Sequence, residues 1–292
     1  MHEKKGENMV TMELKRGSGS WLRAGSLALV VVLATLVAMP RIAGAADDET
    51  KTTYTRIELW QVERSMWDEF VELFEANDQK ILQKMMTDGA ITEWGIDSML
   101  IHTPDGYTHS VWYSAESMGA LVKAGEAYDA AWKAMSKESM NALDDDFAAM
   151  ITKHRDYVVE TDNLRTAAGT YDGGYYESNF VLVDRAHHRG FHSYYDNRIR
   201  PVLESLFEKG AVVAYGLSTE AVTTDNPMGH SWWYIVPDAD GLDAVKAAFD
   251  ADWDALDDEG RRERWAGIRE TIEPGSFREE MTSIIHWSVK AH

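Results

Sequence analysis

Residues 109–113 read HSVWY, and residues 230–234, which lie 121 positions later, read HSWWY. The same shift aligns residues 81–135 with residues 202–256 without a gap, and fifteen of these 55 positions are identical. Self-similarity at one fixed spacing is the signature of a repeated structural unit. The sequence therefore predicts a tandem duplication of one α+β module.

Module boundaries follow from the limits of this repeat. Residues 161–174 hold three glycines among polar residues, which is typical of a linker. We expect the first module over residues 46–160 and the second over residues 175–292, with residues 1–45 as a separate N-terminal segment.

Hydrophobic spacing predicts the same elements in each module. Strand-like runs at 55–62 and 179–183 are each followed by an apolar stripe of helical spacing, which in the first copy predicts one helix of about five turns. Two strands joined by a turn come next, at 90–101 and 107–114 in the first copy and at 211–222 and 228–236 in the second. A second helix, an extra short helix and a last strand at 158–160 or 284–289 complete each copy.

The resulting order β-α-β-β-α-β is that of a ferredoxin-like module. Two helices cover only one face of such a sheet, so the other face needs a partner. We expect the two modules to pack sheet to sheet as an intrachain dimeric α/β barrel, and the chain to be a monomer.

The N-terminal segment resembles a secretory signal peptide. Basic residues precede the uncharged apolar run 24–39, and the small residues 43–45 follow it. The run has 16 residues, whereas a membrane-spanning helix needs about 20. We predict cleavage after Ala45, export to the periplasm or the medium, and no membrane attachment afterwards. The alternative is an uncleaved N-terminal anchor.

Composition excludes several classes of function. Residues 46–292 hold 23 basic and 46 acidic residues, so binding to nucleic acid or anionic lipid is not expected. The chain has no cysteine, which excludes disulfides, a thiolate nucleophile and cysteine-ligated metals. Glycine-rich nucleotide-binding motifs and the Gly-x-Ser-x-Gly elbow of hydrolases do not occur.

The repeated HSxWY motif supplies the candidate catalytic residues. Strand alternation places His109 with Tyr113 on one face, and His230 with Tyr234 on the equivalent face of the second copy. If that face looks toward the helices, neutral histidine could act as a base and tyrosine as a donor in a pocket. Burial of all four residues as ordinary core is the alternative.

Aromatic residues near this motif are the candidate ligand-binding residues. They are Trp94 and Tyr215 on the second strands, and Trp132 and Trp253 on the second helices. We expect them to bind a small hydrophobic or aromatic molecule.

Three histidines on the first helix of the second copy open a different possibility. His187, His188 and His192 align with Met66, Trp67 and Val71 of the first copy. An asymmetric haem or metal site is one interpretation, and a surface cluster is the other, because no His-Glu-x-x-His spacing is present.

Short motifs of the first module resemble a known family. They are Trp94-Gly95-x-Asp97, Gly106-Tyr107-Thr108-His109 and Glu116-Ser117. They are similar to the stress-responsive dimeric α/β-barrel family, which includes olivetolic acid cyclase. The resemblance implies that His109 lines a cavity between sheet and helices, and that His230 does so through the repeat. The histidine on the second helix of the cyclase has no counterpart in residues 124–130. The wider superfamily includes monooxygenases and haem-dependent chlorite dismutase relatives.

Together these features predict an exported protein that binds a small molecule and that could transform it without a cofactor, as a monooxygenase, an isomerase or a cyclase. A haem-binding protein and a non-catalytic binding or assembly module are the alternatives.

Overall fold

The computed structural model describes residues 51–101, 106–222 and 227–290. The predicted signal peptide and its cleavage point lie outside these residues. Of the helices that are described, none is long and apolar enough to cross a membrane.

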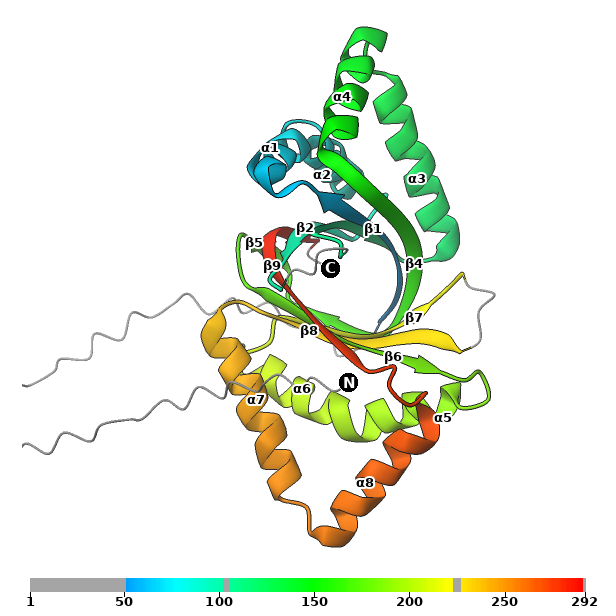
Figure 1. Cartoon of the computed structure of the whole chain (residues 1–292), viewed down its shortest axis with the longest axis vertical. Coiled ribbons are helices and arrows are strands. Elements are labelled where there is room, and N and C mark those ends of the chain that lie inside the picture. Colours follow the sequence, from blue (N-terminus) through cyan, green and yellow to red (C-terminus); the bar gives the residue numbers. More distant parts are fainter. Residues whose placement is uncertain (1–50, 102–105, 223–226, 291–292) are drawn as a thin grey trace, which may run out of the picture. The chain divides into compact units, whose positions relative to one another are not determined.

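The first half of the chain follows the predicted order of strands and helices (Figure 1). Its strands are β1 (Lys51–Val62), β2 (Glu93–Met99), β3 (His109–Ala115) and β4 (Ile151–Thr166). Its helices are the 3-10 turn η1 (Arg64–Met66), α1 (Trp67–Ala76), α2 (Asp78–Asp88), α3 (Met118–Lys133) and α4 (Lys137–Met150).

The second half repeats this order. Its strands are β6 (Tyr175–Val183), β7 (Ala214–Glu220), β8 (Met228–Val236) and β9 (Arg278–Val289), preceded by the short β5 (Gly169–Tyr171). Its helices are α5 (His188–Tyr194), the π-helical turn η2 (Tyr195–Ile199), α6 (Arg200–Glu208), α7 (Ala239–Asp254) and α8 (Asp258–Thr271).

The helix that follows β1 is interrupted, which corrects the prediction of one continuous helix. Asn77 separates α1 from α2 and has a non-helical backbone, with φ −121° and ψ −68°. Its side-chain Nδ2 donates to Leu73 O at 2.9 Å, and an asparagine competes with helical backbone bonds in this way. As the sequence predicts, α2 ends at Gly89, which is left-handed with φ 81°.

The helices before the last strands are longer than expected. The sequence predicts a short extra helix in each module, but α4 and α8 have 14 residues each. Both have an N-cap side chain that accepts from a backbone N–H, Ser136 in α4 and Asp257 in α8.

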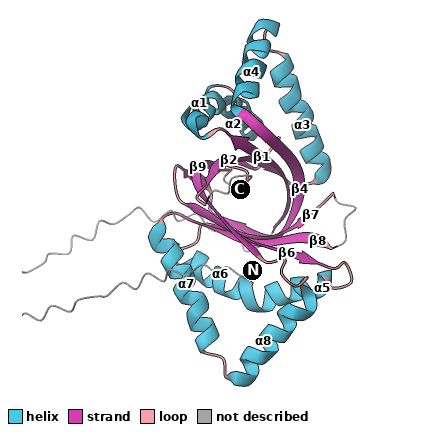
Figure 2. Ribbon diagram, in the orientation of Figure 1, coloured by secondary structure: helices cyan, strands magenta, loops and turns pink. Residues whose placement is uncertain are grey.

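Eight antiparallel strands close into one barrel. The first half contributes the order β2-β3-β1-β4 and the second contributes β7-β8-β6-β9. β4 pairs with β7, and β9 pairs with β2, so the outer strands of each half are joined within the chain (Figure 2). The predicted face-to-face sheets are thus opposite walls of a single closed barrel.

The segment predicted as a linker carries strand structure. β4 continues to Thr166, and β5 pairs with the end of β9. A register shift after Asp162, where Asn163 is left-handed with φ 56°, lets β4 bend while it pairs with β7. Glycine content alone could not reveal this pairing, because β4 finds its partner in β7, far along the chain.

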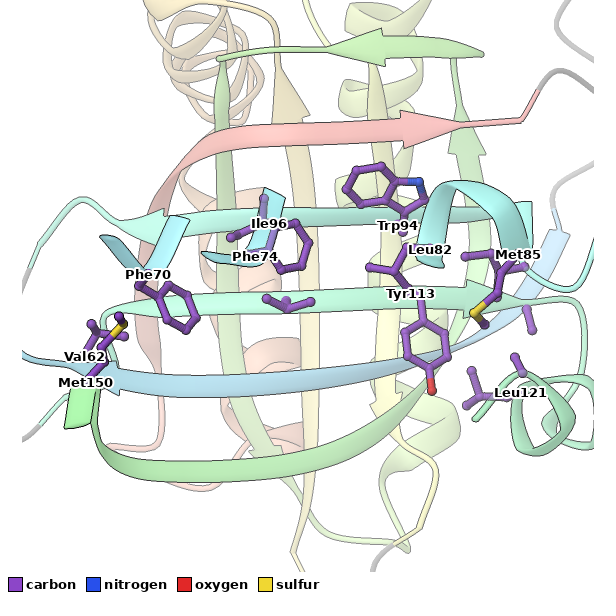
Figure 3. Packing of buried hydrophobic residues seen from close by; sticks show 14 residues of the cluster. Val62, Phe70, Phe74, Leu82, Met85, Trp94, Ile96, Tyr113, Leu121 and Met150 are labelled. Carbon is purple, nitrogen blue, oxygen red and sulfur yellow. The ribbon is translucent and has the colours of Figure 1, made fainter. Parts of the chain in front are cut away.

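Apolar side chains between the helices and the first half of the barrel form a dense core (Figure 3). Phe70, Phe74 and Leu82 from α1 and α2 pack against Trp94 and Tyr113 of the strands. Each such residue when fully buried contributes about 1.5–3 kcal/mol to stability. A corresponding cluster lies under α5, α6 and α7 in the second half. This packing fixes which face of each strand looks into the barrel.

Candidate functional site

His109 and Tyr113 lie on the face of β3 that looks toward the helices. His109 is buried, and its ring lies 5.5 Å from Trp67 and 5.0 Å from Phe70 between ring centroids. Thr108 Oγ1 lies 3.0 Å from His109 Nδ1. Tyr113 is also buried and stacks on Tyr128 at 6.3 Å. Core side chains therefore surround both residues, and a catalytic role for them stays a prediction.

His230 and Tyr234 occupy the equivalent positions on β8. Both are buried. Unlike His109, His230 has a histidine neighbour: its Nε2 lies 2.9 Å from His188 Nδ1. Tyr234 stacks on Trp232 at 6.4 Å.

The four aromatic residues predicted to bind a ligand are packed within the protein. Trp94 is buried and stacks on His286 at 4.6 Å. Tyr215 is buried and donates a hydrogen bond to Glu204. Trp132 packs between Tyr128 and Phe147, and Trp253 packs against Trp265 of α8. A ligand role for these residues also stays a prediction.

A cavity of about 100 Å³ lies inside the barrel, on the opposite face of the same strands. All eight barrel strands contribute to the lining of this cavity. Along β3, Ser110 and Trp112 face the cavity, whereas His109 and Tyr113 face the helices. Its walls combine aromatic, aliphatic, hydroxyl and acidic side chains, among them Trp112, Trp233, Trp287, Tyr157, Tyr176, Ser110, Ser114, Thr282, Glu93, Asp97, Glu280 and His286.

Two buried carboxyl groups belong to this lining. Asp97 Oδ2 accepts a hydrogen bond from Ser110 at 2.7 Å, whereas Asp97 Oδ1 is buried without a partner among the described residues. Glu93 Oε2 accepts from Trp287 Nε1 at 3.3 Å. Burial raises the pKa of Asp97 to about 6 and also raises the pKa of Glu93. Both groups therefore hold a proton more readily than an exposed carboxyl.

These carboxyl groups occur in only one half of the barrel. In the β2–β3 pair, Glu93 lies opposite Ser114 and Asp97 opposite Ser110. At the same register positions of the β7–β8 pair stand Ala214 and Ser218. Because the second half forms the same wall with alanine and serine, the barrel itself does not require acidic residues there.

Comparison with known proteins identifies the fold. Neither a protein-family model nor a curated protein matches the sequence. A "putative monooxygenase" from Fusobacterium nucleatum matches the structure with a TM-score of 0.52 and 9% identity, over 82% of this chain and 96% of that one. A second "putative monooxygenase", from Lactobacillus acidophilus, has a TM-score of 0.50 and 13% identity, over 82% and 97% of the two chains. A chlorite dismutase from Candidatus Nitrospira defluvii has a TM-score of 0.39 and 7% identity, over 80% and 91%.

The chain has the dimeric α/β-barrel fold. This confirms the predicted fold. Identity this low establishes the shared fold and leaves activity to the residues of each site.

In this α/β barrel, three histidines of the second half come together outside the cavity. His188 and His192 of α5 and His230 of β8 each offer a ring nitrogen, and these atoms lie within 4.8 Å of one another. Burial lowers the pKa of His230 to about 4 and also lowers the pKa of His192, so both are neutral at pH 7. His187, the third histidine considered for a haem ligand, is exposed.

The surroundings of this cluster do not fit haem. Haem iron takes one axial ring nitrogen in a pocket whose walls accommodate the macrocycle. Here three ring nitrogens converge, and the open pocket beside them is lined by polar residues, His188, Arg189, His192, Ser193, Asp196 and Asn197. Such an arrangement suits a small ion.

Sequence reasoning missed Glu93 and Asp97. Strand alternation places Glu93 and Asp97 on the face of β2 opposite to Trp94. The repeat of 121 residues aligns these two acidic residues with neutral residues in the second module. Acidic residues in one module and neutral residues at the aligned positions of the other were the sequence signal for a site. The meeting of His230 with His188 and His192 carried no local signal, because β8 and α5 are about 40 residues apart in sequence.

Proposed function

We propose that the chain is an exported, tandemly duplicated α/β barrel that binds a small aromatic or hydrophobic molecule in its barrel cavity. In this proposal residues 1–45 are removed, and residues 46–160 and 175–292 are the two copies of the module. The observation that carries it is a pair of buried carboxyl groups, Glu93 and Asp97, facing an aromatic cavity in a fold that does not need them.

The lining favours a ligand that is neutral or positively charged. Tryptophan rings provide flat apolar contact area, and they attract cations by cation–π interaction. The lining residues include carboxyl groups but no lysine or arginine. A carboxylate ligand would meet these groups without a compensating cation, whereas an amine or hydroxyl could donate to the unpaired Asp97 Oδ1.

Asp97 is also the group best suited to chemistry. Its pKa near 6 lies close to neutral pH, and Ser110 fixes one of its oxygens while the other is free to meet a ligand. If the protein is an enzyme without a cofactor, of monooxygenase, isomerase or cyclase type, Asp97 is the base. Two neighbours in fold carry the description "putative monooxygenase", which agrees with this extension.

Three probes of similar size separate these possibilities: benzylamine, benzyl alcohol and benzoate. Binding to the mature protein at pH 7 is followed by tryptophan fluorescence, because Trp112, Trp233 and Trp287 line the cavity. We expect benzylamine to bind best and benzoate worst, and Asp97→Ser, which introduces the second-half residue, to remove the preference for the amine. Equal or tighter binding of benzoate would sink the proposal.

Native mass spectrometry of protein from an exporting host tests occupancy directly. A bound molecule lost in Asp97→Ser and retained in the surface variant Asp243→Ser would support the cavity as the site. Its conversion by wild-type protein, slowed by about 100-fold or more in Asp97→Ser, would establish catalysis. An empty protein that binds none of the three probes would favour the non-catalytic assembly alternative.

A further inference from the structure

We propose that His188, His192 and His230 bind one divalent first-row transition-metal ion, such as zinc or copper, with a coordination position left open. Imidazole nitrogens suit these metals, and three histidines with an open fourth position are a recurrent arrangement for zinc. This centre is separate from the barrel cavity, because His230 lies on the helix-facing side of β8.

The backbone brings the three rings to one point. His188 and His192 are four residues apart on α5, so they lie on one face of the helix. Their ring centroids are 4.1 Å apart, and those of His188 and His230 are 5.1 Å apart. His188 Nδ1 and His230 Nε2 approach to 2.9 Å, close to the spacing of two ligands on one ion at metal–nitrogen distances of about 2.0–2.1 Å.

An outer hydrogen bond orients the ring of His230, and a carboxylate lies near the ring of His192. His230 Nδ1 lies 3.2 Å from Met228 O, and since a carbonyl can only accept, Nδ1 carries the hydrogen and Nε2 presents its lone pair to the cluster. The carboxylate of Asp162 lies 3.9 Å from His192 Nδ1 and places negative charge beside the cluster. A carbonyl or carboxylate on the second nitrogen is the usual support of a metal-binding histidine.

The first half of the barrel shows that packing does not require three histidines here. His109 corresponds to His230, and it packs against Trp67 at the position that aligns with His188. Val71 stands where His192 stands in the second half. The same helix–strand contact is thus made with one histidine and two apolar residues, so the additional rings are free to serve another purpose.

The side of the cluster away from β8 is open. A pocket of about 390 Å³ adjoins His188 and His192 and is lined further by Arg189, Ser193, Asp196 and Asn197. An ion held by the three rings would have this pocket at its remaining coordination position. A bound water or a small anion fits such a position, which distinguishes this centre from a closed structural zinc site.

The test uses mature protein made without a polyhistidine tag and stripped with a chelator. Cobalt(II) is titrated and followed by its visible absorption, and zinc is titrated by calorimetry and counted by native mass spectrometry. We expect one equivalent of either ion. The double variant His188→Trp with His192→Val, which copies the first half, should lose at least about 100-fold in affinity.

Two further variants keep the outcome unambiguous. His192→Val alone tests the site with a single substitution, and circular dichroism checks that each variant folds. Glu58, His154 and Asp156 form a second group of potential ligands, so His154→Ala is the matched control and should leave affinity and stoichiometry unchanged. Stoichiometric binding that survives the double variant, or that is lost in His154→Ala, would overturn the proposal. A Soret band with added haem that disappears in the double variant would assign the histidines to haem instead.

Discussion

Asp97 and Ser218 occupy the same position in the two halves of one barrel, Asp97 opposite Ser110 and Ser218 opposite Ser231. An ionised Asp97 carboxylate can only accept hydrogen bonds, and one of its oxygens is buried without a partner in the part of the chain that the structure describes. The serine at the equivalent position has a hydroxyl that can donate or accept, and it pairs with the hydroxyl of Thr161 at 2.7 Å. An acidic residue is therefore the less stable choice at this position.

Asp97→Ser is expected to stabilise the protein at neutral pH. The pKa of Asp97 rises from 3.8 unfolded to about 6 folded because of burial. As pH rises, the Asp97 carboxyl therefore ionises at lower pH in the unfolded state than in the folded state. The free energy of unfolding decreases between about pH 4 and pH 6. Above this range the full cost of burying the ionised carboxylate applies. A pKa shift of this size corresponds to a destabilisation of roughly 3 kcal/mol in the wild-type protein. Asp97→Ser removes this cost, but it also loses the hydrogen bond from Ser110, which is worth about 1 kcal/mol.

Urea denaturation of wild type and Asp97→Ser between pH 4 and pH 8 measures this difference. The gap between the two proteins should widen as pH rises toward 7, whereas Asp243→Ser, an exposed helix position, should track wild type throughout. A constant gap, or a variant less stable than wild type at pH 7, would contradict the predicted burial cost.

Binding of a cationic ligand should follow the ionisation of Asp97. Benzylamine stays protonated across pH 5 to 7, while Asp97 loses its proton near pH 6. Its affinity should therefore rise with pH in wild type, and benzyl alcohol should show little change. Fluorescence titrations at several pH values check this. A pH profile that persists in Asp97→Ser would assign the effect to another group.

Two glycines keep space for the tryptophans of the cavity. A Cβ at Gly95 would meet Trp112 at 2.6 Å, and one at Gly216 would meet Trp233 at 3.0 Å. Gly95→Ala should displace Trp112, destabilise the protein by about 1–3 kcal/mol and weaken probe binding. Gly119→Ala in α3 meets nothing within 4 Å and is the control, expected to be neutral or slightly stabilising. Thermal unfolding and fluorescence titration measure both effects.

The sequence predicted the fold better than the site, and particular residues explain why. Residues such as Phe70 and Trp94 recur with helix and strand periodicity, and that local pattern determines which face is buried. The sequence predicts an intrachain barrel, but it does not reveal that β2 pairs with β9 to close it, because these strands lie far apart in sequence. The repeated HSxWY motif predicts a site on the helix-facing side of the strands, whereas Asp97 occurs in one module only and has no repeat to mark it.

His109→Ala distinguishes a site at the helix-facing pair His109 and Tyr113 from a site in the barrel cavity. His109 packs against Trp67 and Phe70, so its truncation should cost about 1–3 kcal/mol in unfolding free energy. Because the ring points away from the cavity, affinity for benzylamine should stay within about two-fold of wild type, a change of less than 0.5 kcal/mol. Loss of binding or turnover without loss of stability would instead restore His109 and Tyr113 as site residues.

The mature chain should be a monomer. The outer strands of the two halves are already paired within one chain, β4 with β7 and β9 with β2. Unpaired outer strands are the usual route to further association, and closure removes them. Residues 46–292 hold 23 basic and 46 acidic residues, and this net charge of −23 adds repulsion between copies. Light scattering after size exclusion should give the mass of one chain at low and high salt, and a dimer that persists at high salt would show that another surface, rather than a sheet edge, is used for assembly.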